Sequence, residues 1–155
     1  IFFDTEFVED GKTIDPLSLG FSTQDNDGLY IVIEDQDPLH TNWWVDKNVR
    51  PYLGETVGGI EPIYAKRADA GKIILDWVSG KTNSPAFWAY YADYDWVLFC
   101  QLYGRMLDLP PGWPMLCMYF KQSNPKSPLN TPIIEHHAYG DAEALMRTYY
   151  DYRID

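Results

Sequence analysis

The 155-residue chain is 46% apolar and 16% aromatic, a composition that predicts one folded domain over residues 1–155 and excludes a disordered protein. Its 23 acidic and 12 basic residues give a net charge of −11, which counts against a protein that grips long duplex DNA through its phosphates. No apolar run reaches the roughly 18 residues of a membrane span, and no charged-then-apolar leader precedes the first strand, so we expect a cytoplasmic protein without membrane contact.

Three strands are predicted at the start of the chain. Residues 1–7, 16–23 and 28–34 are rich in apolar side chains, and a polar turn at residues 24–28 separates the second from the third. Because the connections are short, we expect an antiparallel meander. Residues 35–60 follow no regular period and are predicted to be irregular.

Helix and strand patterns alternate in the middle of the chain. Pro62 suits the first turn of a helix, and apolar residues at helical spacing continue as far as Gly80. Residues 86–91 then read as a fourth strand, and residues 93–105 as a second helix.

One further strand and one further helix are predicted before the chain ends. Three prolines precede a strand at residues 115–120, a loop rich in Pro, Ser and Asn covers residues 121–132, and a helix runs from about His137 to Tyr152. The order βββ-α-β-α-β-α predicts an α/β fold: a mixed five-stranded sheet, with its first three strands antiparallel, flanked by helices.

Both cysteines lie in apolar segments. Cys100 and Cys117 show neither CxxC spacing nor a matching Cys/His set, so we expect buried, reduced thiols and no zinc site.

The first strand contains two acids, Asp4 and Glu6, in an otherwise apolar run. Side chains two residues apart point to the same face of a strand, so these carboxylates would repel each other if buried. A divalent cation removes that penalty, and Mg²⁺ or Mn²⁺ prefers carboxylate oxygens. The alternative is an exposed edge strand with an ordinary acidic face.

Two further acids lie where predicted helices begin. Asp95 follows the fourth strand and Asp141 enters the last helix. Acids there are commonly caps, and Asp93, which directly follows the strand, is the better cap candidate. Asp95 would then face the end of the sheet from the first turn.

The three histidines differ in context. His136 lies in the loop before the last helix, and His137 lies four residues before Asp141, so that it would share the helix face of that acid. His40, in the irregular segment, is predicted to be structural or incidental.

Taken together, these residues follow the order of the three motifs of the DEDD exonucleases: Asp-x-Glu on the first strand, an acid after the fourth strand, and His-x4-Asp entering the last helix. Residues 136–142, with the pattern H-x-A-x-x-D-A, resemble the third motif of the DEDDh branch. Residues 2–7, 43–51 and 94–104 are most similar to the bacterial polyadenylate-specific 3′-exoribonucleases, the RNase AS type.

This resemblance implies an RNase H-like fold and a 3′-to-5′ exoribonuclease. Such an enzyme releases 5′-mononucleotides from the 3′ end of single-stranded RNA with two Mg²⁺ or Mn²⁺ ions. It further implies that Asp4, Glu6 and Asp141 surround the first ion, that Asp4 also reaches the second, and that Asp95 acts as a ligand directly or through water. His136 would accept the proton of the attacking water. A homodimer is implied as well.

One position departs from the family pattern. Many DEDDh members have Asn four residues before the second-motif Asp, where this chain has Tyr91, so the contacts made by that Asn are not carried over to this chain. In the sister branch a Tyr lies four residues before the last Asp, at the position of His137. The spacing of five residues, with Ala138 and Ala142, favours His136 as the working residue.

Substrate contacts are predicted at Thr5, Phe7 and Trp96. Each ring directly follows a motif acid, where it could stack on the terminal base, and core packing is the alternative for both. No residue is identified that would read adenine. The basic residues that could contact phosphates are Lys121, Lys126, Arg105 and Arg67.

Two other functions fit parts of the pattern. A DNA-directed 3′-to-5′ exonuclease uses the same chemistry and differs in its demand for a 2′-hydroxyl. A non-catalytic module for single-stranded nucleic acid would use the aromatic residues but has no need of the acids. The negative net charge does not exclude an enzyme that takes only a strand end, because bound cations reverse the local field.

Overall fold

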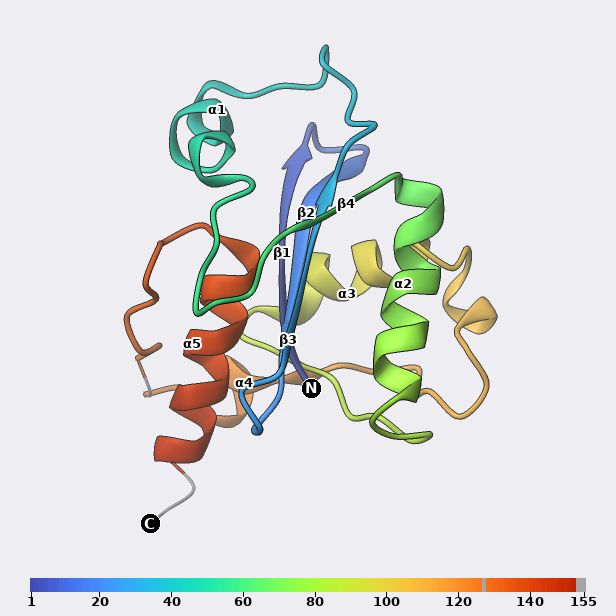
Figure 1. Ribbon diagram of the computed structural model, residues 1–155, viewed down its shortest axis with the longest axis vertical. Coiled ribbons are helices and arrows are strands. Elements are labelled where there is room, and N and C mark those ends of the chain that lie inside the picture. Colours follow the sequence, from blue (N-terminus) through green and yellow to red (C-terminus); the bar gives the residue numbers. More distant parts are fainter. Residues whose placement is uncertain (127, 153–155) are drawn as a thin grey trace.

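A mixed sheet forms the centre of the molecule in the computed structural model, which describes residues 1–126 and 128–152 (Figure 1). The strands β1 (Phe2–Glu9), β2 (Ile14–Ser22) and β3 (Gly28–Ile33) pair in antiparallel fashion. The predicted meander is therefore confirmed.

The sheet has six strands, in the order β4-β3-β2-β1-β5-β6, so the prediction of five was wrong. The additional strand, β4 (Ile63–Ala65), pairs in parallel with β3 inside the segment predicted to start a helix at Pro62. Its apolar residues fit helical spacing as well as they fit a short strand, and pairing with β3 decides between the two. The helix α2 (Arg67–Ser79) begins after Lys66, whose backbone is extended.

The opposite end of the sheet is built from two very short parallel strands. β5 (Trp88–Ala89) and β6 (Met118–Tyr119) cover only part of the predicted segments. The pairing of β5 with β1 is limited to Trp88 and Phe2. Beyond residue 2, this edge of β1 is open to contacts from side chains.

The two remaining long helices lie close to their predicted positions. They are α3 (Ala92–Gln101), which ends four residues before the predicted limit, and α5 (Ala138–Asp151). Shorter helical segments occupy stretches for which no helix was predicted: α1 (Trp43–Asn48), a 3-10 turn at Arg50–Tyr52, a second at Met106–Asp108, and α4 (Phe120–Ser123).

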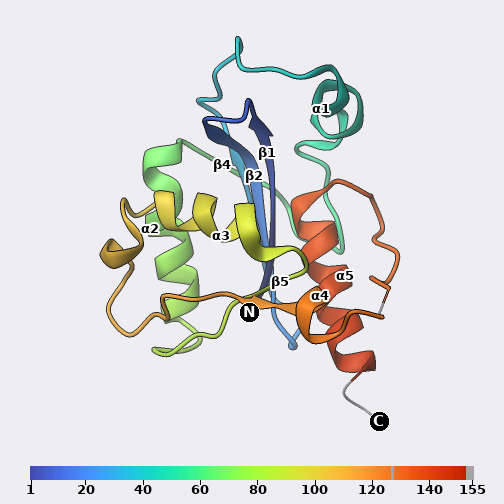
Figure 2. The ribbon, with the colours of Figure 1, turned by 180° about the vertical axis from the view of Figure 1, so that it is seen from behind.

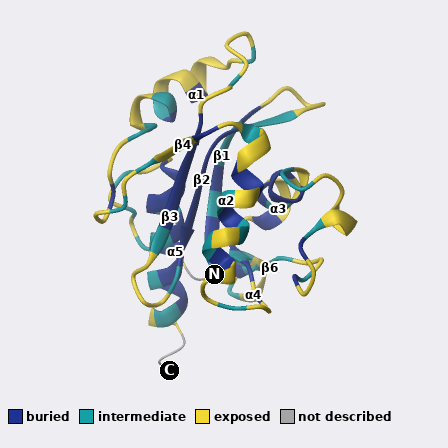
Figure 3. Cartoon of the chain, turned by 45° about the vertical axis from the view of Figure 1, so that its right-hand side comes forward, coloured by how far each residue is buried: buried dark blue, intermediate teal, exposed yellow. Residues whose placement is uncertain are grey.

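The helices cover both faces of the sheet. α5 packs on one face, and α2 and α3 pack on the other, as the front and rear views show (Figures 1 and 2). β2 and β3 are almost wholly buried, while the outer sides of the helices are exposed (Figure 3). Phe3 belongs to the core beneath α2 and α3, whereas Phe2 belongs to the core beneath α5.

The start of α5 lies unusually close to β2. A Cβ atom placed on Gly20 would lie 2.1 Å from the backbone nitrogen of Tyr139, so only glycine permits this approach. Gly20 is also the residue paired with Asp4 on the neighbouring strand. The first turn of α5 is thereby placed beside Asp4.

No helix within residues 1–126 and 128–152 has the length and apolar character needed to cross a bilayer. Both cysteines are free thiols; Cys100 is buried and Cys117 is partly buried.

Candidate active site

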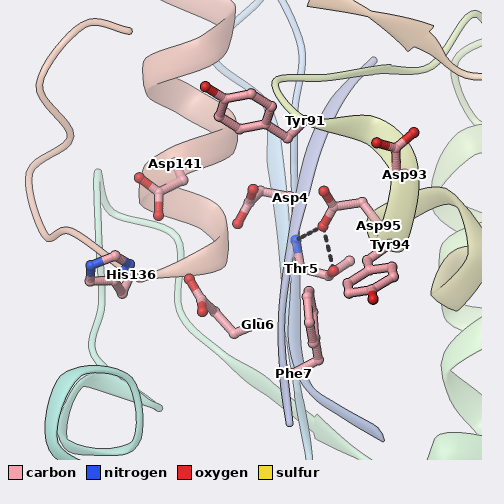
Figure 4. Close-up of a pocket in the computed structure, with 10 residues that line it drawn as sticks. All are labelled: Asp4, Thr5, Glu6, Phe7, Tyr91, Asp93, Tyr94, Asp95, His136 and Asp141. Atoms are coloured by element: carbon pink, nitrogen blue, oxygen red, sulfur yellow. Dashed lines mark hydrogen bonds between the residues drawn. The ribbon is translucent and has the colours of Figure 1, made fainter. Parts of the chain in front are cut away.

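The acids of β1 face α5. Because side chains alternate along a strand, Asp4 and Glu6 lie on the same face as Phe2, which packs against α5, and opposite Phe3. Figure 4 shows both carboxylates pointing toward Asp141, in the first turn of α5.

Three carboxylates meet at this point. One oxygen each from Asp4, Glu6 and Asp141 lies within 4.8 Å of the other two, and all three residues are partly buried. None of the ion pairs in the described part of the chain involves these acids. Three carboxyl groups thus share one small space without an ion-pair partner in the described part of the chain.

The pKa values of these acids reflect that crowding. Burial is the largest cause, and it raises the pKa of Asp4 well above its ordinary value, that of Glu6 to about 8 and that of Asp141 to about 7. Repulsion from neighbouring carboxylates adds to the shift at each position. The carboxylates resist ionisation together, and a cation among their oxygens would offset both effects.

Asp95 enters the same pocket from α3 but has a different partner. Its Oδ1 accepts hydrogen bonds from the backbone N–H of Thr5 at 3.0 Å and from the Thr5 hydroxyl at 2.5 Å. Thr5 lies on the edge of β1 that short β5 leaves open, so the carboxylate takes the place of a neighbouring strand. Burial raises the pKa of Asp95 to about 6, and the hydrogen bonds from Thr5 oppose the rise. Asp95 is therefore fixed in place but lies outside the three-oxygen cluster.

His136 and His137 point in opposite directions. His136 is exposed, lines the pocket with the acids, and has a left-handed backbone with φ of 59°. His137 is buried at the N-cap of α5: its Nδ1 accepts the backbone N–H of Gly140 at 3.1 Å, and its Nε2 lies 3.0 Å from the carbonyl oxygen of Glu55. Burial lowers the pKa of His137, which keeps the ring neutral in this structural position.

A hollow of about 570 Å³ opens in front of the carboxylates (Figure 4). Its aromatic side is formed by Phe7 and Tyr94, whose rings meet at 5.7 Å in a T-shaped contact, and by Tyr91. Tyr91 and Tyr94 are 57% and 49% exposed, so their rings are available to a ligand. Tyr94 was not predicted as a site residue; its place directly before Asp95 was the available signal.

Trp96 does not line this hollow. Its ring stacks on Phe99 at 5.2 Å and also contacts Phe87, which places it in the aromatic core under α3. Of the predicted substrate contacts, the structure brings Thr5 and Phe7 to the hollow and leaves Trp96 outside it.

The predicted phosphate contacts also lie outside the lining of the hollow. Arg67 pairs with Asp15, and Arg105 pairs with Asp108. Lys121 lies 5.6 Å from the ring centre of Tyr90. Lys126 is exposed.

Two secondary predictions can also be judged. Tyr91, rather than Asp93, occupies the N-cap of α3, and Asp93 lies in the first turn, so the predicted cap was wrong. The strand ends earlier than expected, which moves the helix start back by one residue. His40 contacts Asp15 and does not line the hollow, which fits the structural role predicted for it.

Comparison with known proteins provides independent information. No family model matches the chain. Two proteins of Mycobacterium tuberculosis, from strains CDC 1551 / Oshkosh and ATCC 25618 / H37Rv, are each named 3′-5′ exoribonuclease. Each is 34% identical to this chain over 122 residues, which is 78% of this chain and 71% of the relative.

Proposed function

Since the chain belongs to the family of these 3′-5′ exoribonucleases, we propose that it removes nucleotides from the 3′ end of single-stranded RNA as 5′-mononucleotides. The observation that carries the proposal is the meeting of Asp4, Glu6 and Asp141 oxygens within 4.8 Å of one another, beside an open hollow. We further assign the chain to the DEDDh branch and an RNase H-like fold. The motif order and the position of His136 support this assignment.

The chemistry of the donor set fits two Mg²⁺ or Mn²⁺ ions. The donors are hard carboxylate oxygens, they lack ion-pair partners in the described part of the chain, and burial and mutual repulsion raise their pKa values, which a bound cation would offset. Asp4, Glu6 and Asp141 would hold the first ion, with Asp4 shared to the second and Asp95 contributing directly or through water. Bound divalent cations supply charge neutralisation and Lewis-acid activation to phosphodiester hydrolysis.

The protein's own residues then have distinct tasks. A ring nitrogen of His136 accepts the proton of the attacking water, the general-base task that histidine performs most often in enzymes. Phe7 and Tyr94 form a wall on which the terminal base can stack, a contact that reads no sequence. Thr5 holds Asp95 in its orientation through two hydrogen bonds.

Adenylate preference and dimer formation complete the proposal. Both rest on the resemblance of residues 2–7, 43–51 and 94–104 to the RNase AS type. We expect oligo(A) to be degraded faster than oligo(U). Light scattering of the purified protein would give the mass of a dimer.

A single set of digestions tests the proposed activity. Oligo(A), oligo(U) and oligo(dA), each labelled at the 5′ end, are incubated with the protein in Mg²⁺ or in EDTA. We expect a ladder that shortens from the 3′ end on RNA, with mononucleotide product, only with Mg²⁺. Equal rates on oligo(dA) would favour a DNA-directed exonuclease. Binding of oligo(A) without cleavage, retained in Asp4→Asn, would indicate a non-catalytic module.

A further inference from the structure

Trp44 forms the aromatic contact of the His136 ring. The two ring centres lie 4.9 Å apart with an angle of 76° between the planes, an edge-on geometry favoured by aromatic pairs. The residues are far apart in sequence, one on α1 and the other just before α5. Their contact joins α1 to the segment that leads into α5, two parts of the chain that lie near each other in Figure 1.

His136 has little else to orient it. No hydrogen bond to its ring occurs within residues 1–126 and 128–152, and the side chain is exposed. Open spaces lie around it: the hollow of about 570 Å³ before the acids, and a second of about 370 Å³ bounded by Asn48, Tyr52 and residues 133–136. Without a neighbour, the ring could rotate into either space.

The backbone of Trp44 is anchored at the start of α1. The side chain of Asn42 caps α1 by accepting the backbone N–H groups of Trp44 at 2.9 Å and Val45 at 3.4 Å. Val45 is buried in a cluster with Val8, which lies on β1 beyond the two acids. The backbone that carries the indole is therefore anchored to the strand that presents the carboxylates, and the Trp44 side chain, 41% exposed, contacts the His136 ring.

A second anchor lies at the other end of α1. Arg50 donates to Asp46 at 2.8 Å and to Gln36 at 2.6 Å, which ties the helix to the chain that follows β3. The helix that carries Trp44 is thus anchored at both ends, whereas His136 lies at the end of a loop.

We infer that Trp44 is a positioning residue that holds the His136 imidazole toward the carboxylates, an inference that rests on the proposed function. A proton acceptor must stay within hydrogen-bonding reach of the water it activates, and a freely rotating ring spends only part of its time there. Trp44 needs no contact with RNA for this task. Its removal should lower turnover without weakening substrate binding.

The kinetic test separates positioning from RNA binding by using a minimal substrate. Adenosine 5′-(p-nitrophenyl phosphate) contains one nucleotide, so it cannot report contacts with the upstream strand. We expect Trp44→Ala to lower kcat about 3- to 10-fold on this ester and on oligo(A), with KM unchanged. Trp44→Phe, which keeps a flat ring, should recover most of the loss. Trp43→Ala is the matched control, because Trp43 is the adjacent residue on α1 and is 74% exposed.

The second readout observes the contact directly in the metal-free protein. The chain has only three histidines, so the His136 ring signals can be assigned by NMR from their absence in His136→Ala. We expect those signals to shift in Trp44→Ala as the indole ring current is lost, and to stay in place in Trp43→Ala.

Each other outcome has a defined meaning. Loss of activity on oligo(A) alone, with a raised KM, would show that Trp44 binds RNA and would overturn the inference. Unchanged kinetics or unchanged His136 signals in Trp44→Ala, with an active wild type, would overturn it while leaving the proposed function intact. A wild type inactive on both substrates would refute the proposed function and, with it, this inference.

Discussion

Glu6→Gln is expected to stabilise the metal-free protein at alkaline pH. Burial first, and repulsion from Asp141 and Asp95 second, raise the pKa of Glu6 from 4.5 to about 8 in the folded state. A carboxyl group whose pKa rises on folding stabilises the fold while it is protonated. That contribution is complete below about pH 4.5 and is lost as the pH rises through about 8. Wild-type protein in EDTA should therefore lose stability across this range.

The size of the effect follows from the same pKa difference. From 4.5 to about 8, at 1.36 kcal/mol for each tenfold change in proton affinity, the wild type loses about 5 kcal/mol. Neighbouring acids share this repulsion and titrate together with Glu6, and the amide of Gln must itself be solvated. We therefore expect Glu6→Gln to raise the free energy of unfolding by about 2–3 kcal/mol at pH 9, and by almost nothing at pH 4.

Urea denaturation followed by tryptophan fluorescence measures this difference. Wild type, Glu6→Gln and the control Glu9→Gln are unfolded in EDTA at pH 4, 7 and 9; Glu9 is an exposed acid at the end of the same strand. Saturating Mg²⁺ at pH 9 should then stabilise wild type more than the variant. A variant that is less stable than wild type at pH 9 in EDTA, or equally stabilised at every pH, would refute the electrostatic reasoning.

The remaining predictions concern the two adjacent histidines, the close approach of α5 to Gly20, and the hydrogen bonds from Thr5 to Asp95. His136→Ala should abolish turnover while RNA binding, measured by filter binding, and Mg²⁺ binding, measured by calorimetry, persist. His137→Ala should lower the free energy of unfolding by about 1–2 kcal/mol in urea melts, because the cap of α5 is lost. Gly20→Ala should lower the free energy of unfolding by about 3 kcal/mol and abolish activity, because its Cβ would lie 2.1 Å from a backbone nitrogen of α5. The control Gly80→Ala, where the nearest atom is 3.5 Å away, should leave the free energy of unfolding unchanged in the same melts. Thr5→Val should weaken Mg²⁺ binding about 10-fold, because the hydroxyl bond, one of the two hydrogen bonds that orient Asp95, is lost. Calorimetry measures the affinity, and an unchanged value would contradict this expectation.

Local periodicity predicted the parts of the fold that obey it. The alternation of apolar and acidic residues in β1 placed Asp4 and Glu6 on one face, and the structure has them there. β4 was missed because three residues, Ile63–Ala65, are too few to show a period of two, and the choice depended on pairing with distant β3. The short span of β5 likewise depends on neighbours that its own sequence does not reveal.

In the site, too, local pattern predicted some features, and others depend on contacts between distant residues. The structure places His136, and not His137, in the lining of the hollow, and the choice of His136 as the proton acceptor stays a prediction. His136 has a left-handed backbone directly before the N-cap of α5, a local conformation that the residue pattern did not predict. The contact of His136 with Trp44 and that of Phe7 with Tyr94 each link separate elements, so neither could be read from local pattern.

The packing of α5 against Gly20 also determines when the carboxylate cluster can form during synthesis of the protein. Asp4 and Glu6 leave the ribosome among the first residues of the described chain, and Asp141 follows more than a hundred residues later. Until the last helix has emerged and docked, a nascent polypeptide holds two of the three clustered acids and lacks the histidine beside them. A nascent copy in which α5 has not yet emerged therefore cannot assemble the cluster of Asp4, Glu6 and Asp141.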